Sequence, residues 1–133
     1  MDLRNVVVAI SGASGSIYGI RVLQMLRQVE DVNSHLVITP SAKSTIGVET
    51  EYSVSEIEEL ADEVHSARDI GASIASGSFK TVGMIVAPCS IKTLSAIANS
   101  FGADLVSRAA DVTLKERRPL VLMVRETPFH LGH

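Results

Sequence analysis

The sequence predicts a three-layer α/β fold with a mainly parallel sheet, and three observations support this prediction. Apolar, β-branched runs of strand length recur along the chain, as expected of strands buried on both faces. Segments with apolar residues at helical spacing separate them. Gly, Ser and Pro follow the apolar runs where turns are needed. Strands that alternate with helices in this way form parallel sheets with helices on both faces.

The first part of the chain predicts a strand, a helix and a second strand. Residues 5–10 are a continuous aliphatic run that stops at a Ser-Gly pair, which is typical of a central strand. Residues 16–29 have an apolar stripe opposite regularly spaced polar residues, so we expect a helix there. Residues 34–39 form the next strand, and Pro40 closes it because proline cannot donate to a sheet.

The middle of the chain predicts a further helix and a third strand. Ser53 to Glu56 fits a capping box, and the apolar residues at 57, 60, 61 and 64 continue a helix through Val64. Residues 74–79 are too small and irregular to assign. A strand follows at 83–87, and Pro88 ends it.

The last part predicts two helices and a fourth strong strand. Ser90 opens one helix through Ile97, a longer helix runs from about 104 to 117, and residues 120–124 form a strand. Thr127-Pro128 predicts another helix start, with a capping hydroxyl and proline at the first position. We therefore expect one domain, residues 1–133, that is truncated just inside a helix.

Composition excludes several classes of protein. Hydrophobic residues make up 46% of the chain and charged residues 20%, a balance typical of packed proteins and not of disordered ones. A net charge of −3 offers no basic field for nucleic acid. No apolar run is long enough to cross a bilayer, no signal peptide is evident and a single cysteine forms no internal disulfide. We therefore expect a cytoplasmic protein with no membrane or nucleic-acid partner.

Two polar turns are candidates for a ligand site. Residues 11–16 are small, so backbone amides could approach an anion at a helix start. Their glycine spacing is not that of a dinucleotide fingerprint, and a purely structural turn explains them equally well. Residues 88–93 follow the third strand, where Ser90 and Thr93 could face a ligand or Ser90 could simply cap a helix. Open α/β sheets bind ligands at this edge, which favours the ligand interpretation when both turns are considered.

Charged residues give a second set of candidates. Arg108 and Lys115 lie two helical turns apart on one face, although a solvated surface stripe explains them as well. Arg125 and Glu126 follow the last strand at its carboxyl end. Glu49 is placed in a loop, where surface acids are common. The four histidines show no metal-ligand spacing, so no metal is expected.

Segments along the whole chain, taken together and in order, resemble the UbiX-type flavin prenyltransferases. They are residues 11–15, 36–39, 49–50, 75–79, 87–90, 92–94, 108–112, 114–117 and 125–128. The resemblance implies a Rossmann-like or flavodoxin-like fold, a homo-oligomer that is commonly a dodecamer, and FMN as the cofactor. The implied reaction joins a dimethylallyl group from dimethylallyl phosphate to reduced FMN. Its product serves UbiD-type decarboxylases.

The same resemblance assigns roles to residues of this chain. It places the flavin-binding residues at Gly12, Ala13, Ser14, Thr39, Ser90, Ile91, Lys92, Thr93 and Arg125. It places Glu126, Lys115, Arg108 and Glu49 at the prenyl-phosphate end of the site, partly contributed across subunits, with Ser14 and Glu126 as candidates for proton transfer. Family members continue with a C-terminal segment that contributes further phosphate contacts.

Two alternatives remain at this point. One is an FMN-dependent decarboxylase that acts directly on an aromatic acid, although the related cysteine decarboxylases use a histidine where this chain has residues 14–18 without one. The other is a chain that binds FMN but is inactive because of truncation.

Overall fold

Residues 3–133, which a computed structural model describes, form one parallel sheet of five strands in the order β3-β2-β1-β4-β5. The strands are β1 (Arg4–Ile10), β2 (Val32–Ile38), β3 (Glu63–Ser66), β4 (Gly83–Cys89) and β5 (Leu120–Val124). The helices are α1 (Ser16–Leu26), α2 (Pro40–Glu49), α3 (Val54–Glu58), α4 (Ile91–Ala98) and α5 (Leu105–Lys115), with a 3₁₀ turn η1 (Ser73–Ala75). The predicted α/β class is confirmed, and the strand order matches the first five positions of the Rossmann order 3-2-1-4-5-6.

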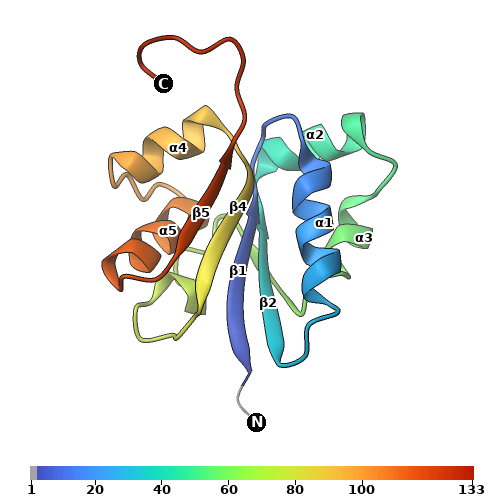
Figure 1. Ribbon diagram of the computed structural model, residues 1–133, viewed down its shortest axis with the longest axis vertical. Helices are drawn as coiled ribbons and strands as arrows, with labels where there is room; N and C mark the ends of the chain where they lie inside the picture. Colours follow the sequence, from blue (N-terminus) through green and yellow to red (C-terminus); the bar gives the residue numbers. More distant parts are fainter. Residues whose placement is uncertain (1–2) are drawn as a thin grey trace.

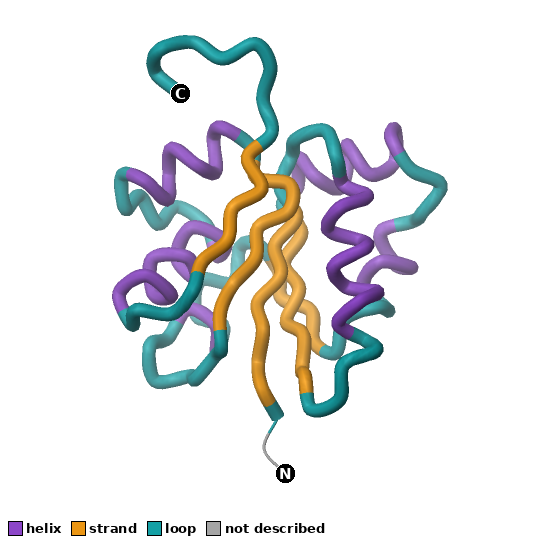
Figure 2. Tube along the Cα trace, in the orientation of Figure 1, coloured by secondary structure: helices purple, strands orange, loops and turns teal. Residues whose placement is uncertain are grey.

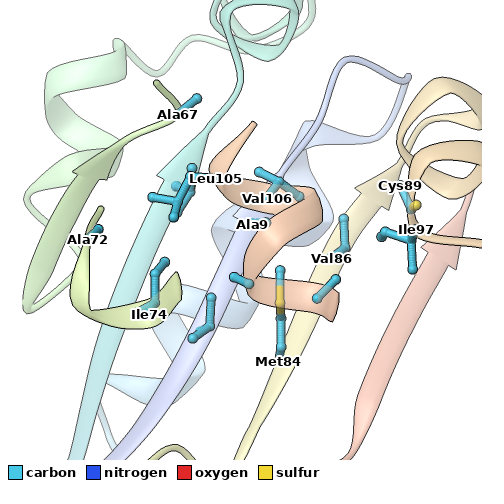
Figure 3. Close-up of a cluster of buried hydrophobic side chains, with 14 residues drawn as sticks. Ala9, Ala67, Ala72, Ile74, Met84, Val86, Cys89, Ile97, Leu105 and Val106 are labelled. Atoms are coloured by element: carbon cyan, nitrogen blue, oxygen red, sulfur yellow. The ribbon is translucent and has the colours of Figure 1, made fainter. Parts of the chain in front are cut away.

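Helices cover both faces of the sheet, which makes three layers. Figure 1 shows α1, α2 and α3 on one side of the strands and α4 and α5 on the other, and Figure 2 shows the sheet as the middle layer. Side chains of alternating direction along β1 supply both cores, since Val8 and Ile10 pack toward α1 and Val7 and Ala9 toward α5. Figure 3 shows the core on the α5 side, where Val106 of α5 lies beside Ala9 of β1.

The connections reverse direction between β1 and β4. From β1 the chain moves outward to β2 and β3, and then crosses back to β4 and β5 on the other side. The carboxyl ends of β1 and β4 therefore lie side by side, and the loops that leave them diverge to opposite faces. This is the position at which open α/β sheets form a ligand-binding crevice. Within residues 3–133 no helix is long and apolar enough to span a membrane.

Helix starts agree well with the sequence predictions. Ser53, Ser90 and Asp104 each cap the helix that follows, and the capping box of Ser53 and Glu56 is present with both hydrogen bonds. The predicted strand 120–124 is β5 without change, and 5–10 is extended by Arg4. Predicted helix ends are late by two or three residues, since α1 ends at Leu26 and α5 at Lys115. Helix ends depend on the final turn, which the apolar pattern defines poorly.

The helix predicted from Ser53 through Val64 is wrong in its second half. The helix α3 ends at Glu58, and Val64 lies in β3, where it pairs with Leu36 of β2. Val64 is 43% exposed, so the helical spacing of this valine does not reflect burial. Hydrogen bonds to the free edge of β2 therefore outweigh continuation of the helix.

One proline does more than the sequence predicts, and another does not act as predicted. Pro40 follows β2 but also begins α2, for which Thr39 is the N-cap, so Glu49 is the last residue of a helix and not part of a loop. Pro88 lies within β4 rather than after it, and Cys89 pairs with Val124 beyond a register irregularity. A proline tolerates this place because the irregularity removes the need for its amide hydrogen.

The predicted helix start at Thr127-Pro128 is also wrong. Residues 125–133 contain no helix, and nearly all of them are exposed, including Phe129 and Leu131. A helix of this length needs an apolar surface to pack on, and this segment contacts none. Figure 1 shows the segment extending away from the end of β5.

Candidate functional site at the carboxyl edge of the sheet

A cleft of about 740 Å³ lies at the carboxyl edge of the sheet, on the side of α4 and α5. Its walls come from the turn after β1, the start of α2, the segment after β3, one face of α4 and the first turn of α5. Its volume is within the range of about 300–1,000 Å³ that is typical of small-molecule sites. The cleft therefore lies where the reversal of strand order predicts a ligand site.

Ser11 joins the two candidate turns. Its hydroxyl donates to the carbonyl oxygen of Pro88 at 2.8 Å and accepts from the amide of Ser90, also at 2.8 Å. Ser11 is 1% exposed, so these bonds are shielded from water. The hydroxyl fixes the start of α4 against the end of β1. Ser11 lies in a predicted turn, but sequence reasoning did not single it out.

The start of α4 forms one wall of the cleft. The Ser90 hydroxyl accepts from the Thr93 amide at 3.2 Å and donates to the Thr93 hydroxyl at 3.0 Å. Lys92 and Thr93 line the cleft together with Ser90, whereas Ile91 belongs to the same turn but does not line it. The first amides of a helix have no partner within the helix, and its dipole favours negative charge. This turn can therefore hold an anion.

The start of α2 forms the opposite wall. The Thr39 hydroxyl accepts from the Ala42 amide at 3.2 Å and caps the helix, and Thr39 and Ser41 both line the cleft. Gly12 lies against this wall so closely that an added Cβ would collide with the Cβ of Ser41. Only glycine permits this approach, which brings the backbone of the first turn to the edge of the cleft.

A third helix start has its own carboxylate. Asp104 caps α5, and its Oδ1 accepts from the Ser107 amide and hydroxyl, both at 2.9 Å. Asp104 and Ser107 line the cleft. Because this carboxylate offsets the positive end of α5, an anion is favoured near the starts of α2 and α4 instead.

Glu49 reaches the first turn from the end of α2. Its Oε2 accepts from the Gly15 amide at 3.1 Å. Gly15 has a φ of 109°, a left-handed conformation that favours glycine. Ala13 and the exposed Ser14 lie in the same turn. The structure therefore brings Glu49 and Ser14 to the same turn, although α2 ends more than thirty residues after that turn.

Arg125 and Glu126 lie at the same edge but outside the walls of the cleft. The Arg125 amide donates to the carbonyl oxygen of Cys89 at 3.1 Å, which holds the segment after β5 beside the end of β4. The Arg125 side chain is exposed, and Glu126 is half-buried, with its carboxylate accepting from the Thr127 amide.

Arg108 and Lys115 are not brought to the cleft together. Both are exposed on α5. Arg108 lies one turn after the start of the helix, with its Cγ beside Gly102. Lys115 is the last residue of α5, and ten residues of helix span about 15 Å. Within one chain, Lys115 therefore lies near the opposite edge of the sheet from the cleft.

Several cleft residues were missed by sequence reasoning. Ser95, Asn99 and Phe101 extend the wall formed by α4, and Arg68 lines it from the segment after β3. The spacing of 92, 95, 96 and 99 marks one helix face and could have suggested the first two. Arg68 gave no signal, because β3 is short and polar, and the predicted helix through Val64 included its first half.

Cys89 is not a reactive thiol, and the described acidic residues form no metal centre. Burial raises the pKa of the Cys89 thiol to about 11, so this side chain is a small apolar group of the core at neutral pH. Among residues 3–133, no cluster of three or more His, Cys, Asp or Glu side chains could hold a metal ion.

Comparison with known proteins gives consistent results. The Flavoprotein family model matches residues 1–130. The flavin prenyltransferase UbiX of Escherichia coli K12 is 60% identical over 131 residues, which are 98% of this chain and 69% of that protein. The crystal structure of AnUbiX (PadA1) in complex with FMN and dimethylallyl pyrophosphate superposes with a TM-score of 0.94 at 52% identity, covering 97% of this chain and 68% of that one.

A second solved structure is equally similar in fold. A dodecameric FMN-dependent UbiX-like decarboxylase from Escherichia coli O157:H7 has a TM-score of 0.94 at 48% identity, covering 96% of this chain and 69% of that one. Matches of this identity extend through both turns, the cleft and α5. The chain belongs to the flavoprotein family and, within it, to the UbiX-type flavin prenyltransferases.

Proposed function

We propose that this chain transfers a dimethylallyl group from dimethylallyl phosphate to reduced FMN in the cleft at the carboxyl edge of the sheet. The observation that carries the proposal is the convergence of the starts of α2 and α4 with the glycine-containing turn after β1 around one cleft. This arrangement suits a ligand with a phosphate at one end and an apolar ring at the other. The prenylated flavin would serve a UbiD-type decarboxylase.

The residues of the cleft fit a flavin mononucleotide. The hydroxyls of Thr39, Ser90 and Thr93 and the first amides of α2 and α4 offer donors to a phosphate, and Lys92 adds a positive charge. The close approach of Gly12 to Ser41 leaves the backbone of the turn free of side-chain bulk. We propose that Gly12, Ala13, Ser14, Thr39, Ser90, Ile91, Lys92, Thr93 and Arg125 hold the flavin.

The apolar part of the cleft gives room for rings and chains. Ala96, Phe101 and Ala103 line it beyond the helix starts. When bound and reduced, FMN supplies the nucleophilic ring atoms, N5 and C6, to which the dimethylallyl group becomes attached. The protein's task is to hold that ring still and to keep water away from an electron-poor allylic group.

Charged residues at the rim would act on the donor. Transfer breaks the allylic C–O bond, and the electron pair of that bond leaves with the phosphate oxygen. Cationic side chains stabilise this developing charge, and we assign Arg108, Lys115 and Arg125 to that role. Since Lys115 lies away from the cleft of its own chain, the proposal places Arg108 and Lys115 at the site of a neighbouring copy.

Proton transfer would fall to carboxylates near the first turn. Glu49 already accepts from the Gly15 amide, which holds its carboxylate beside Ser14. Glu126 follows β5 at the same edge. Ring closure on the flavin needs one proton delivered and one removed, and Glu126, Glu49 and Ser14 are the groups placed to exchange them with the departing phosphate.

We also propose that the chain forms a homo-oligomer. A homo-oligomer, of dodecameric size as in the UbiX-like structure from Escherichia coli O157:H7, would bring α5 of one copy to the cleft of another. We place this single flavin-binding domain in the cytoplasm, as the sequence suggests.

The experiment is an anaerobic incubation of the chain with reduced FMN and either dimethylallyl phosphate or dimethylallyl pyrophosphate, followed by mass spectrometry of the flavin. Prenylated flavin from the monophosphate alone supports the full proposal, and prenylated flavin from the diphosphate alone overturns the choice of donor. Unchanged flavin at full occupancy with both donors contradicts prenyl transfer by this chain. Adding an aromatic acid in a parallel reaction tests direct decarboxylation by release of carbon dioxide.

A further inference from the structure

A histidine pair lies outside the cleft, between β2 and β3, with His35 buried and His65 half-buried. The Nδ1 atom of His35 is 2.9 Å from Nε2 of His65, and the two rings are stacked with centroids 5.2 Å apart and an interplanar angle of 7°. His35 is 1% exposed. Phe79 packs edge-on against His35 with centroids 5.2 Å apart. Two histidines that meet through ring nitrogens in a shielded position must share a proton in a defined way.

The partners of the pair assign that proton. Asn33 donates both amide hydrogens, to Oδ1 of Asn5 at 3.1 Å and to Oε2 of Glu63 at 2.8 Å. Those two acceptors also face Nε2 of His35, at 3.1 and 3.2 Å. The amide nitrogen of Asn33 also lies 3.1 Å from Nε2 of His35, but both of its hydrogens are donated elsewhere. With two acceptor oxygens facing Nε2, we assign the His35 hydrogen to Nε2, so that Nδ1 accepts from Nε2 of His65.

This arrangement accepts only a limited number of protons. The neutral pair already holds one hydrogen between the facing nitrogens. One additional proton can be taken up at Nδ1 of His65, because Nε2 of that ring still donates to Nδ1 of His35. A further proton, on Nδ1 of His35, would place N–H against N–H at 2.9 Å, so double protonation is incompatible with this contact.

Charged groups around His35 affect how readily this side chain is protonated. Glu63 and Asp62 on the β3 side stabilise a protonated His35, whereas burial and the positive charge of His65 oppose it. On the opposite side, the guanidinium of Arg118 donates to the carbonyl oxygens of Phe79 and Gly77. Burial is the largest effect and lowers the pKa of His35 below 6.5, so acid acts against the folded arrangement as pH falls through and below that value.

The pair joins β2 to a strand, β3, that leads directly to the cleft. The strand β3 is an edge strand, hydrogen-bonded to β2 alone, and it contains both Glu63 and His65. Two residues after His65 the chain reaches Ala67, whose carbonyl oxygen accepts from the Leu105 amide at the start of α5. Ala67 and Arg68 form one wall of the cleft.

We propose that His35 and His65 are positioning residues that hold β3, and through it the Ala67–Arg68 wall, in the conformation that binds the flavin, and that double protonation of the pair loosens this wall. The pair touches neither flavin nor donor. It acts through the register of β3, and the functional part of this inference rests on the proposed flavin site.

The first test measures FMN affinity by fluorescence quenching at pH 7.5 and 5.5. His65→Gln keeps an amide donor toward His35 but cannot take up a proton. We expect this variant to bind FMN like the parent at pH 7.5. Between pH 7.5 and 5.5 the parent should lose about fivefold more FMN affinity than the variant loses. The comparison cancels the titration of the FMN phosphate itself. His130→Gln, at an exposed histidine of the C-terminal segment, is the matched control and should behave like the parent.

A second test works without any flavin. Hydrogen exchange of the parent, corrected for intrinsic rates, should accelerate between pH 7.5 and 5.5 at residues 63–68 but not at residues 4–10 of β1. Equal changes in the two segments, or equal losses of FMN affinity in the parent and His65→Gln, would overturn the inference. If the parent bound no FMN at pH 7.5, the flavin proposal would fail, and hydrogen exchange would still decide the role of the pair.

Discussion

The two faces of the sheet differ in how closely their helices approach it. On one face α1 contacts the sheet at Gly19, where an added Cβ would collide with the carbonyl oxygen of Ala87 and lie within 3 Å of Ile10 side-chain carbons. On the other face the cleft opens at the carboxyl edge, beside α4 and the start of α5. Figure 1 shows α1 on one side of the strands and α4 and α5 on the other. The closed face provides packing, and the open face provides the ligand site, so substitutions on the two should affect different properties.

Gly19→Val should have the largest effect, and it should be on stability. Two methyl groups and a Cβ would enter a space already occupied by backbone and by Ile10, and α1 would have to move away from the sheet. We expect the free energy of unfolding to fall by about 3 kcal/mol or more. Urea denaturation followed by circular dichroism measures it.

Gly47→Ala is the matched control for that substitution. Gly47 lies within α2, and no atom lies within 4 Å of an added Cβ. Alanine there should stabilise by roughly 0.5–1 kcal/mol, because it reduces the backbone freedom of the unfolded chain. Equal destabilisation by both substitutions would contradict the close approach of α1.

Ser90→Glu should have the next largest effect, on flavin binding. A carboxylate at the start of α4 would repel the flavin phosphate and remove the hydroxyl that Thr93 uses. We expect FMN affinity to fall about 100-fold, equivalent to about 2.7 kcal/mol, as measured by fluorescence titration.

Ser53→Glu places the same substitution at the N-cap of α3, on the closed face. It should cost about 1 kcal/mol of stability and leave FMN affinity unchanged. Parent-like affinity in Ser90→Glu would show that the flavin does not use the start of α4.

Lys115→Ala tests whether the far end of α5 contributes to prenyl transfer. If Lys115 serves the cleft of a neighbouring copy, the rate of prenyl transfer should fall about tenfold, or about 1.4 kcal/mol, with FMN affinity unchanged. Arg21→Ala, on the exposed face of α1, should leave both unchanged. The measurement is single-turnover formation of prenylated flavin. A transfer rate equal to that of the parent would instead support the interpretation of Lys115 as part of a solvated surface stripe.

The smallest effect concerns Cys89, which lies in the core beneath the cleft. With its pKa raised to about 11, roughly one thiol in a thousand is ionised at pH 8. We expect iodoacetamide to leave the folded protein unmodified over an hour and to alkylate it fully in urea, as read by intact mass. Rapid alkylation of the folded protein would mean that this side of the cleft opens to solvent.

Much of the fold and part of the candidate site were predictable from local sequence. The aliphatic runs of β1 and β5 both form strands because such side chains favour the sheet, although β1 is buried in the centre whereas β5 is a largely exposed edge strand. Ser53, Ser90 and Asp104 cap helices because their oxygens satisfy amides that the helix cannot. The turns after β1 and β4 could be placed at one sheet edge because parallel strands share a direction.

Tertiary structure alone decided the rest, as two Thr-Pro pairs illustrate. Thr39-Pro40 begins α2, which buries Ala42 and Ile46 against the core, whereas Thr127-Pro128 begins no helix. The local capping signal is the same in both. A helix of moderate length is stable in water chiefly when it buries an apolar face, and only the first pair has such a surface to pack on.

The same reasoning explains β3 and Arg68. Residues 63–66 have no strong strand pattern, and three of the four are exposed, but the free edge of β2 supplies hydrogen bonds that local spacing cannot reveal. Once β3 forms, Arg68 must lie at the cleft. The sequence by itself determined the strands, caps and turns, because those depend on neighbouring residues. The tertiary structure decided the edge strand, the second helix and the full lining of the cleft, because those depend on which surfaces the rest of the chain leaves open.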